Sequence, residues 1–237
     1  MNQTAHFIES PSNPCPDGAS FHWMQRGVIR LRYGLWCENE EGASARKGTI
    51  IFIPGRTEFI EKYFETIGEL RERGYAVAAL DVRGQGLSSR LISDKQKGHV
   101  EDFQDYVDDL HAWIEEVVVQ ECPGPFYLFG LSMGGHICLR YLHDHPQHIS
   151  KSVAVAAMTA IKSWPLSARL GQQLIRLGHA IFGHAWGMPG GARANPGETP
   201  FKLNLLTRDK RRFMRTKALL NTAPHMVVGV PTFGWLR

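Results

Sequence analysis

Four short apolar runs, separated by segments with the periodicity of amphipathic helices, constrain the fold of this 237-residue chain more than any other feature. An apolar run without alternating polar residues is typical of a strand buried on both faces of a parallel sheet, and helices between such strands cover the two faces. The pattern therefore predicts an α/β fold with a mostly parallel sheet. The expected strands cover residues 49–53, 75–80, 126–131 and 152–158, and the expected helices cover residues 57–73, 99–120 and 134–145.

The chain divides into three parts around this alternation. Residues 1–27 form a proline-rich N-terminal arm, and residues 28–160 hold the expected core, which begins with a half-exposed strand at residues 28–36. Beyond residue 160 the alternation stops. Residues 161–237 predict helices and a Gly- and Pro-rich loop at residues 183–200, so we expect a helical cap there in place of further strands.

The expected cap is strongly basic. Pro165 opens one amphipathic helix, and residues 208–220 form a second helix rich in Lys and Arg. Residues 151–237 carry 13 basic and two acidic residues, whereas residues 1–150 carry 14 basic and 21 acidic residues. This asymmetry is compatible with two hypotheses, contact with an anionic surface or a basic face in solvent.

The cysteines and the first residues bear on the compartment. Cys15, Cys37, Cys122 and Cys138 are widely spaced and form no C-x-x-C or Cys/His ligand pattern, so we interpret them as reduced packing residues. The first ten residues lack the basic patch and apolar run of a secretory signal, which favours a cytoplasmic location.

Two uncharged stretches, residues 122–139 and 218–236, approach the roughly 20 apolar residues of a membrane-spanning helix. Both are interrupted by Pro and Gly, so neither predicts a transmembrane helix.

The most specific motif is Gly130-Leu131-Ser132-Met133-Gly134, which fits G-x-S-x-G. An expected strand runs into it and an expected helix leaves it, which is the context of a nucleophile elbow. The two glycines suit a sharp turn in which a Cβ would collide, and Ser132 would be exposed above the sheet. The alternative is a plain glycine-rich turn between strand and helix.

A second motif, Ile53-Pro54-Gly55-Arg56, follows the strand at residues 49–53. Acyl transfer requires two backbone N–H donors for the developing oxyanion, one after the nucleophile and one from this loop. Met133 and Arg56 occupy those places. Taken alone, the segment is also compatible with an ordinary Pro-Gly turn.

A third motif, Asp81-Val82-Arg83-Gly84-Gln85-Gly86, follows the strand at residues 75–80. It matches a dinucleotide fingerprint poorly, because the third glycine and the ribose-binding acid are lacking. We expect Asp81 and Arg83 to hold the loop in place.

Together the three motifs resemble the α/β-hydrolase superfamily, and more narrowly its lysophospholipase L2 and monoacylglycerol lipase-like branch with a serine aminopeptidase S33 type of domain. The likeness runs from about Tyr33 to the end of the chain. Pro54 departs from the histidine that many relatives carry before the oxyanion glycine. The resemblance implies a serine hydrolase whose catalytic acid and histidine follow Ser132, in that order, on loops after two further strands.

Those two partners are not evident in this chain. The carboxylates after Ser132 are Asp144, Glu198 and Asp209, and none follows an apolar strand. The sequence therefore suggests a hydrolase that lacks its last strands and is nearly inactive as written. In the resembling fold this would leave residues 152–158 as an open edge strand and the apolar faces of the cap helices partly uncovered.

The expected function is hydrolysis of a carboxylic ester of a monoacyl lipid through an acyl-enzyme on Ser132. Arg56 and Met133 would supply the N–H donors, and no metal, cofactor or nucleic acid is implied. The basic cap would allow peripheral contact with an anionic membrane. The alternative is a catalytically dead remnant or an interaction protein, because the triad acid and histidine are absent.

Overall fold

The computed structural model describes residues 3–37, 47–161, 167–188, 200–204 and 206–237. Its centre is a sheet with the strand order β1-β2-β3-β5-β4-β6-β7. Strands β5, β4, β6 and β7 run parallel to one another, and β1, β2 and β3 extend the sheet beyond β5 in antiparallel fashion. The strands are β1 (Gln3–Thr4), β2 (Ser20–Arg26), β3 (Ile29–Trp36), β4 (Thr49–Ile53), β5 (Ala76–Leu80), β6 (Phe126–Leu131) and β7 (Ile149–Val155).

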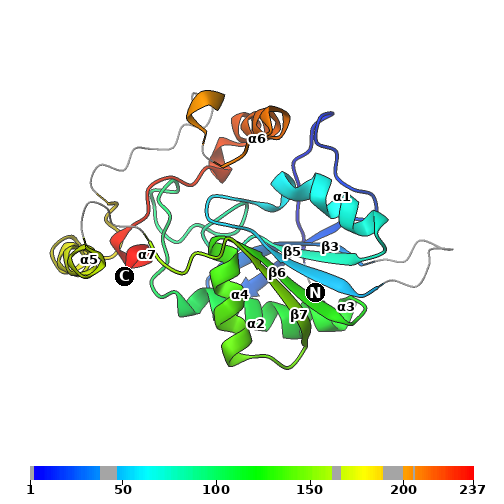
Figure 1. Cartoon of the computed structure of the whole chain (residues 1–237), viewed down its shortest axis with the longest axis horizontal. Coiled ribbons are helices and arrows are strands. Elements are labelled where there is room, and N and C mark those ends of the chain that lie inside the picture. Colours follow the sequence, from blue (N-terminus) through cyan, green and yellow to red (C-terminus); the bar gives the residue numbers. More distant parts are fainter. Residues whose placement is uncertain (1–2, 38–46, 162–166, 189–199, 205) are drawn as a thin grey trace.

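Helices cover both faces of this sheet, as the alternation predicts (Figure 1). Helix α1 lies on one face, and α2, α3 and α4 lie on the other. The two faces carry separate apolar clusters, one including Phe52 and Phe64 and the other including Trp113 and Ile137. The elements are the 3-10 turn η1 (Ile60–Tyr63), α1 (Phe64–Glu72), α2 (Gln104–Trp113), the π-helical turn η2 (Ile114–Val118), α3 (Val119–Glu121) and α4 (Met133–Asp144). The α/β fold class is thus confirmed.

The N-terminal part of the chain belongs to the sheet, contrary to the expectation of an arm outside the core. Strand β2 lies within residues 1–27 and pairs with β3 along its whole length, from Ser20 opposite Leu35 to Arg26 opposite Ile29. Its sequence mixes polar and apolar residues without strict alternation, so no strand pattern is visible. Pairing with β3 across the turn at Gly27, which has a φ of 58°, makes it a strand.

Among the boundaries that differ from the sequence expectation, those of β7 and α2 have clear local reasons. Strand β7 begins and ends three residues earlier than expected, because Ala156 has a φ of 46° and turns the chain toward the end of β6. Helix α2 begins at Gln104 and not at residue 99. Residues 96–98 lie instead beside the C-terminal segment, where Gly98 donates to the carbonyl of Val230 and accepts from the N–H of Thr232.

The cap segment lies at one end of the sheet (Figure 1). Its helical nature is confirmed where it is described, although the expected start at Pro165 and most of the loop at residues 183–200 lie outside the described residues. Three-residue turns accompany its helices. The elements are α5 (Ala168–Phe182), η3 (Phe201–Leu203), α6 (Lys210–Thr222), η4 (Pro224–Met226) and α7 (Phe233–Leu236).

Within the residues that the structure describes, the edge of the sheet at β7 is open and the apolar face of one cap helix is uncovered, as expected from the sequence. Strand β7 is the last strand of the sheet, and the Val153 side chain is 54% exposed. The apolar face of α5 is exposed as well, at Leu170, Leu174, Leu177 and Ile181. None of the helices within the described ranges combines the length and the apolar character that a bilayer crossing requires.

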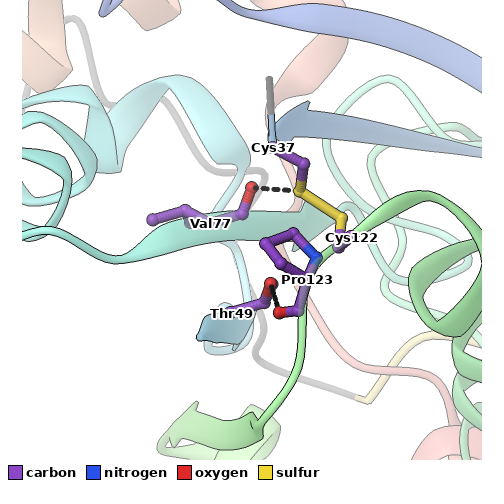
Figure 2. Close-up of a disulfide and its surroundings, with 5 residues drawn as sticks. All are labelled: Cys37, Thr49, Val77, Cys122 and Pro123. Atoms are coloured by element: carbon purple, nitrogen blue, oxygen red, sulfur yellow. Dashed lines mark hydrogen bonds between the residues drawn. A yellow bond between two sulfur atoms is a disulfide. The ribbon is translucent and has the colours of Figure 1, made fainter. Parts of the chain in front are cut away.

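The cysteine interpretation is wrong for one pair, because Cys37 and Cys122 form a disulfide (Figure 2). Cys37 follows β3 and Cys122 follows α3, 85 residues later, and their Cα atoms lie 5.2 Å apart. Thr49 Oγ1 donates to the carbonyl of Pro123 at 2.6 Å and holds the second of these segments against β4. A wide sequence spacing carries no signal of such pairing. Cys15 and Cys138 are free thiols.

We expect two thiols, not four, to react with an alkylating reagent in the unfolded, unreduced chain. A disulfide that closes a loop of 85 residues stabilises a protein by roughly 4 kcal/mol in the chain-entropy description. Cys37→Ser should therefore lower the thermal midpoint by several degrees, whereas Cys15→Ser should change it little. Four reactive thiols in the unreduced chain, or equal midpoints for the two variants, would contradict the bond.

Candidate active site

Ser132 occupies the turn between β6 and α4 in a backbone conformation with φ of 53° and ψ of −114°. A residue with a side chain in such a region costs about 1–3 kcal/mol and persists only where its surroundings fix it. Here the N–H of Ser132 donates to the carbonyl of Val155 at 2.9 Å, and its carbonyl accepts from the N–H of Met158 at 3.0 Å. The chain after β6 and the chain around the end of β7 thus hold this turn together.

The two glycines of the motif permit a close approach of backbone segments, as expected. A Cβ at Gly134 would lie 2.2 Å from the carbonyl oxygen of Ile53, and a Cβ at Gly130 would lie 2.5 Å from the carbonyl oxygen of Gly134. Both distances are too short for a carbon–oxygen contact, so no residue with a Cβ fits at either position without a shift of the backbone. The absence of side chains therefore brings the first turn of α4 against the end of β4.

The loop that follows β4 is held by side chains at three of its backbone polar groups. Glu58 Oε2 accepts from the N–H of Gly55 at 2.7 Å. Gln85 donates from Nε2 to the carbonyl of Gly55 at 3.2 Å and accepts at Oε1 from the N–H of Thr57. The neighbours of Arg56 on both sides are therefore fixed.

The two backbone N–H groups named from the sequence are both unengaged. Among the hydrogen bonds of the described residues, neither the N–H of Arg56 nor the N–H of Met133 has an acceptor. Met133 is the first residue of α4, where a helix leaves its N–H groups unpaired and carries a partial positive charge. These N–H groups remain available to an anionic oxygen.

The side chain of Arg56 has a role that the motif did not reveal. Its Nη2 donates to the carbonyl of Gly229, and the guanidinium carbon lies 5.0 Å from the ring centroid of Trp235. Burial lowers the pKa of Arg56. The loop after β4 is thus linked to the C-terminal part of the cap segment.

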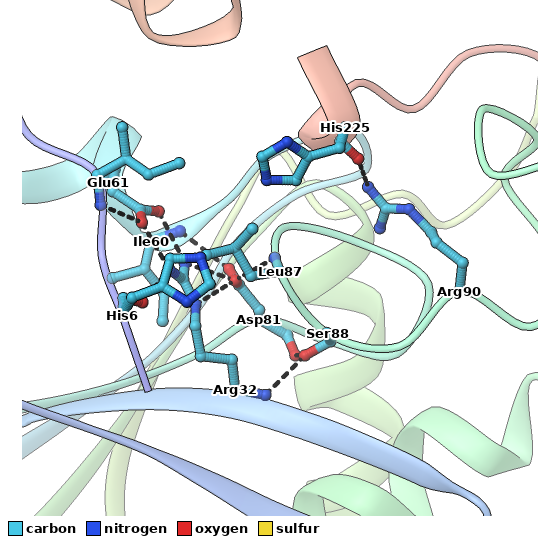
Figure 3. A network of polar contacts seen from close by, with 10 residues as sticks. His6, Arg32, Ile60, Glu61, Asp81, Leu87, Ser88, Arg90 and His225 are labelled. Carbon is cyan, nitrogen blue, oxygen red and sulfur yellow. Dashed lines mark hydrogen bonds and ion pairs between the residues drawn. The ribbon is translucent and has the colours of Figure 1, made fainter. Parts of the chain in front are cut away.

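A buried network of charged side chains holds the loop after β5 and the segment before α1 together (Figure 3). Arg32 pairs with Glu61 and with Asp81, each at 2.6 Å, and all three side chains are fully buried. The Asp81 carboxylate also accepts from the N–H of Ile60 at 3.0 Å and from the N–H of Leu87 at 2.9 Å. Burial raises the pKa of Asp81, whereas Arg32 acts to lower it. Asp81 therefore joins the segment before α1 to the loop after β5.

Arg83 fixes the other side of the same loop. Its guanidinium donates to both carboxylate oxygens of Asp109, at 2.6 and 2.8 Å, and pairs with Asp105 at 2.8 Å. Bidentate pairs of this kind are directional as well as strong. The expectation that Asp81 and Arg83 hold the loop in place is confirmed.

The hydroxyl of Ser132 has no hydrogen-bond partner among the described residues, and no carboxylate–histidine pair faces it there. His136 is the histidine next to the motif, and its ring meets that of Phe103 edge-on with centroids 4.8 Å apart. Burial lowers the pKa of His136. His143 and Asp144 pair with each other at the exposed end of α4.

One side-chain group in the described part has the composition of a cation site. His99, Glu101 and His184 place ligand atoms within 4.8 Å of one another. His99 Nδ1 shares a hydrogen bond of 2.8 Å with Thr232 Oγ1, and its ring stacks on that of His184 with 30° between the planes. Imidazole lone pairs lie in the ring planes, so two stacked rings do not direct their nitrogens at one ion. We therefore interpret these residues as a packing contact between the sheet domain, which contributes His99, and the cap segment, which contributes His184 and Thr232.

Sequence reasoning missed the two side chains that hold the loop after β4. Gln85 lies within the third motif and Glu58 lies two residues after the second, but nothing in their spacing indicates that both bond the backbone of Gly55. Only the order of the strands in the sheet indicates that these residues lie close together. Gln85 follows β5 and Arg56 follows β4, and adjacent parallel strands end at the same edge of a sheet.

Comparisons with known proteins agree with this geometry. A family model described as "Serine aminopeptidase, S33" matches residues 44–235. Lysophospholipase L2 of Escherichia coli (strain K12) is 36% identical over 201 residues, which are 79% of this chain and 55% of that protein. Probable lysophospholipase L2 of Haemophilus influenzae is 32% identical over 209 residues, 88% of this chain and 64% of that protein. The chain thus spans little more than half of the first relative's length.

Solved structures show the same fold. A soluble variant of monoglyceride lipase from Saccharomyces cerevisiae aligns with a TM-score of 0.67 at 20% identity, over 98% of this chain and 70% of that one. A carboxyl esterase from Bacillus coagulans aligns with a TM-score of 0.58 at 18% identity, over 72% of this chain and 53% of that one. With a family match over most of its length and the sheet, turn and loops described above, this chain belongs to the serine aminopeptidase S33 family of α/β-hydrolases.

Proposed function

We propose that this protein hydrolyses carboxylic esters of monoacyl lipids through an acyl-enzyme on Ser132. The observation that carries the proposal is the strained turn at Ser132, which presents a hydroxyl without a partner among the described residues next to an unengaged N–H at Met133. Backbone strain at a single non-glycine residue is typical of functional sites. The lysophospholipase and monoglyceride lipase relatives support the ester class.

In the proposed reaction the Ser132 oxygen attacks the ester carbonyl carbon and gives up its proton to a general base, which is not among the described residues that contact Ser132. The negative charge that develops on the carbonyl oxygen accepts hydrogen bonds from the N–H groups of Arg56 and Met133. The alcohol leaves with a proton, and water then releases the fatty acid from Ser132. The binding of Gly55 and Thr57 by neighbouring side chains supports the placement of the Arg56 donor.

A monoacyl lipid fits the apolar character of the cap segment. Helix α5 exposes a continuous apolar face, and Trp186 beyond it is also exposed. A single acyl chain matches such a surface.

The second candidate function is that of a non-catalytic member of the family that binds a partner. The absence of a histidine at the Ser132 hydroxyl among the described residues favours it. A serine hydroxyl without a base is a weak nucleophile, so a chain in this state would turn over little ester.

A substrate panel separates the candidates. The purified chain is incubated with a lysophospholipid, a monoacylglycerol, a diacyl phospholipid and an aminoacyl anilide, and released fatty acid or aniline is quantified. We expect the two monoacyl lipids to be hydrolysed at least tenfold faster than the other two. Turnover of none of them above the rate of Ser132→Ala would support the non-catalytic candidate, and preferential anilide cleavage would indicate a peptidase.

We further propose that α6 brings the protein to anionic lipid surfaces. Lys210, Arg211 and Arg208 are exposed on or beside this helix, and Asp209 caps its N-terminus. Three arginines of α6, including Arg211, share one carboxylate, that of Glu65, so the positive charge is only partly compensated. Each cation near an anionic leaflet contributes about 1 kcal/mol.

Charge reversal tests this surface. Exchanging both Lys210 and Arg211 for Glu should weaken co-sedimentation with phosphatidylglycerol-containing vesicles by at least tenfold, and salt should weaken the binding of the unaltered protein. The matched control reverses Arg140 and Lys151, which are exposed on α4 and β7 and change the net charge equally. Binding that ignores salt and lipid charge, or equal losses in both double variants, would show that the basic face only contacts solvent.

A cytoplasmic location is a proposal from the sequence, and the Cys37–Cys122 disulfide argues against it. Disulfides persist in oxidising compartments and are rare in the reducing cytoplasm. The number of reactive thiols in the unreduced chain, measured on protein from the native host, decides between a reducing and an oxidising compartment.

A further inference from the structure

Gln85 contacts the backbone on both sides of Arg56 and is otherwise unassigned. Its carboxamide donates to the carbonyl of Gly55 at 3.2 Å and accepts from the N–H of Thr57. A carboxamide offers one donor side and one acceptor side, so this single side chain satisfies two backbone groups of opposite polarity. Between these two anchored residues lies the unengaged N–H of Arg56.

We propose that Gln85 is a positioning residue for acyl transfer, which fixes the loop at residues 55–57 so that the Arg56 N–H is held ready for the oxyanion. The inference rests on the proposed function and deepens it. It also gives a role to the third sequence motif, which the hydrolysis itself does not use.

The side chain is well placed to act as a rigid support. Gln85 is 4% exposed. Its N–H donates to the carbonyl of Val82 at 3.1 Å, and its carbonyl accepts from the N–H of Ser88 at 3.0 Å. The same loop is fixed to the buried network by Asp81 and to α2 by Arg83. The position of the carboxamide is therefore set by β5 and α2.

The supported loop requires such a restraint. Thr57 has a φ of 65°, which a β-branched side chain adopts only at a cost. The bond from its N–H to Gln85 holds it in that conformation, and Glu58 fixes the N–H of Gly55 on the other side of Arg56. Catalytic donors are sensitive to position, and a displacement of about 1 Å can cost about a hundredfold in rate.

The test compares three variants in ester hydrolysis with a short-chain nitrophenyl ester. Gln85→Leu removes both hydrogen bonds at similar volume and should lower kcat by about 10- to 100-fold with KM within twofold of the unaltered protein. Ser88→Ala is the matched control, because Ser88 is a buried polar residue of the same loop that bonds Arg32 and Asp81 and not residues 55–57. It should lower the thermal midpoint and leave kcat within twofold.

Gln85→Glu adds a readout that a packing role would not give. The ionised carboxylate accepts from Thr57 but faces the carbonyl of Gly55 without a proton to donate, whereas the protonated acid restores the donor. Its kcat relative to that of the unaltered protein should therefore rise as pH falls. This isosteric variant also serves if Gln85→Leu does not fold.

A folded Gln85→Leu with unaltered kcat would overturn the proposal, as would equal losses of kcat in Gln85→Leu and Ser88→Ala. If the unaltered protein is no faster than Ser132→Ala, the proposed function fails and amide hydrogen exchange decides on Gln85. Faster exchange at Thr57 in Gln85→Leu than in Ser88→Ala would then support the positioning of the loop, and equal exchange would overturn it.

Discussion

Replacing Ser132 by alanine is expected to lower the ester-hydrolysing rate at least a hundredfold without unfolding the protein. Loss of the nucleophile costs about 10⁶ in kcat in a fully equipped serine protease. We expect a smaller loss here, because no histidine among the described residues bonds the hydroxyl, and the starting rate should therefore be lower. Alanine and serine share the same backbone preferences, so the turn with φ of 53° is strained equally in both.

The control for this prediction is Ser152→Ala, which removes a hydroxyl from an exposed position on β7 of the same sheet. Its rate should equal that of the unaltered protein. Initial rates with a nitrophenyl ester, together with far-UV circular dichroism of each variant, provide the comparison. A folded Ser132→Ala that retains the unaltered rate would remove Ser132 from the chemistry.

Replacing Arg32 by methionine is expected to cost roughly 3–5 kcal/mol in the free energy of unfolding. Arg32 is the shared cation of Glu61 and Asp81, and none of the three side chains is exposed. Its removal leaves two carboxylates buried next to each other without a compensating charge. The penalty should shrink as pH falls, because burial raises the folded-state pKa of Asp81 and the loss of Arg32 removes the charge that acts to lower it, so protonation of Asp81 then favours the folded state.

Urea unfolding at neutral and acidic pH measures this effect. Arg73→Met is the matched control, since Arg73 pairs with Glu69 at 3.9 Å and both side chains are largely exposed. Surface pairs of this kind contribute about 0–1 kcal/mol. Equal midpoints for Arg32→Met and Arg73→Met would show that the buried network does not stabilise the fold.

The sequence predicts this fold best where hydrophobicity is continuous. The bounds of β4 and β6 agree with the apolar runs residue by residue, because both strands lie inside the sheet. The sequence places β2 in an arm, because a strand that owes its conformation to pairing with β3 carries a mixed pattern of polar and apolar residues. The apolar run predicts the end of β7 three residues too late, because the turn at Ala156 depends on the backbone around Ser132 and not on local hydrophobicity.

The candidate site was predictable in part for a similar reason. The Ser132 turn follows from local glycines and was found, whereas the support of Arg56 by Gln85 joins residues 29 positions apart and has no local signature. The Cys37–Cys122 disulfide likewise depends on the three-dimensional placement of two segments 85 residues apart.

The central claim is that Ser132 is the nucleophile of this protein, and reaction with a fluorophosphonate tests it most directly. The intact chain is treated with the reagent near neutral pH, and the site of the adduct is located by peptide mass spectrometry. Our account predicts one adduct, on Ser132, that is absent from Ser132→Ala and forms more slowly in Gln85→Leu. A folded protein that acquires no adduct on Ser132 would contradict it and would identify the chain as a non-catalytic member of its family.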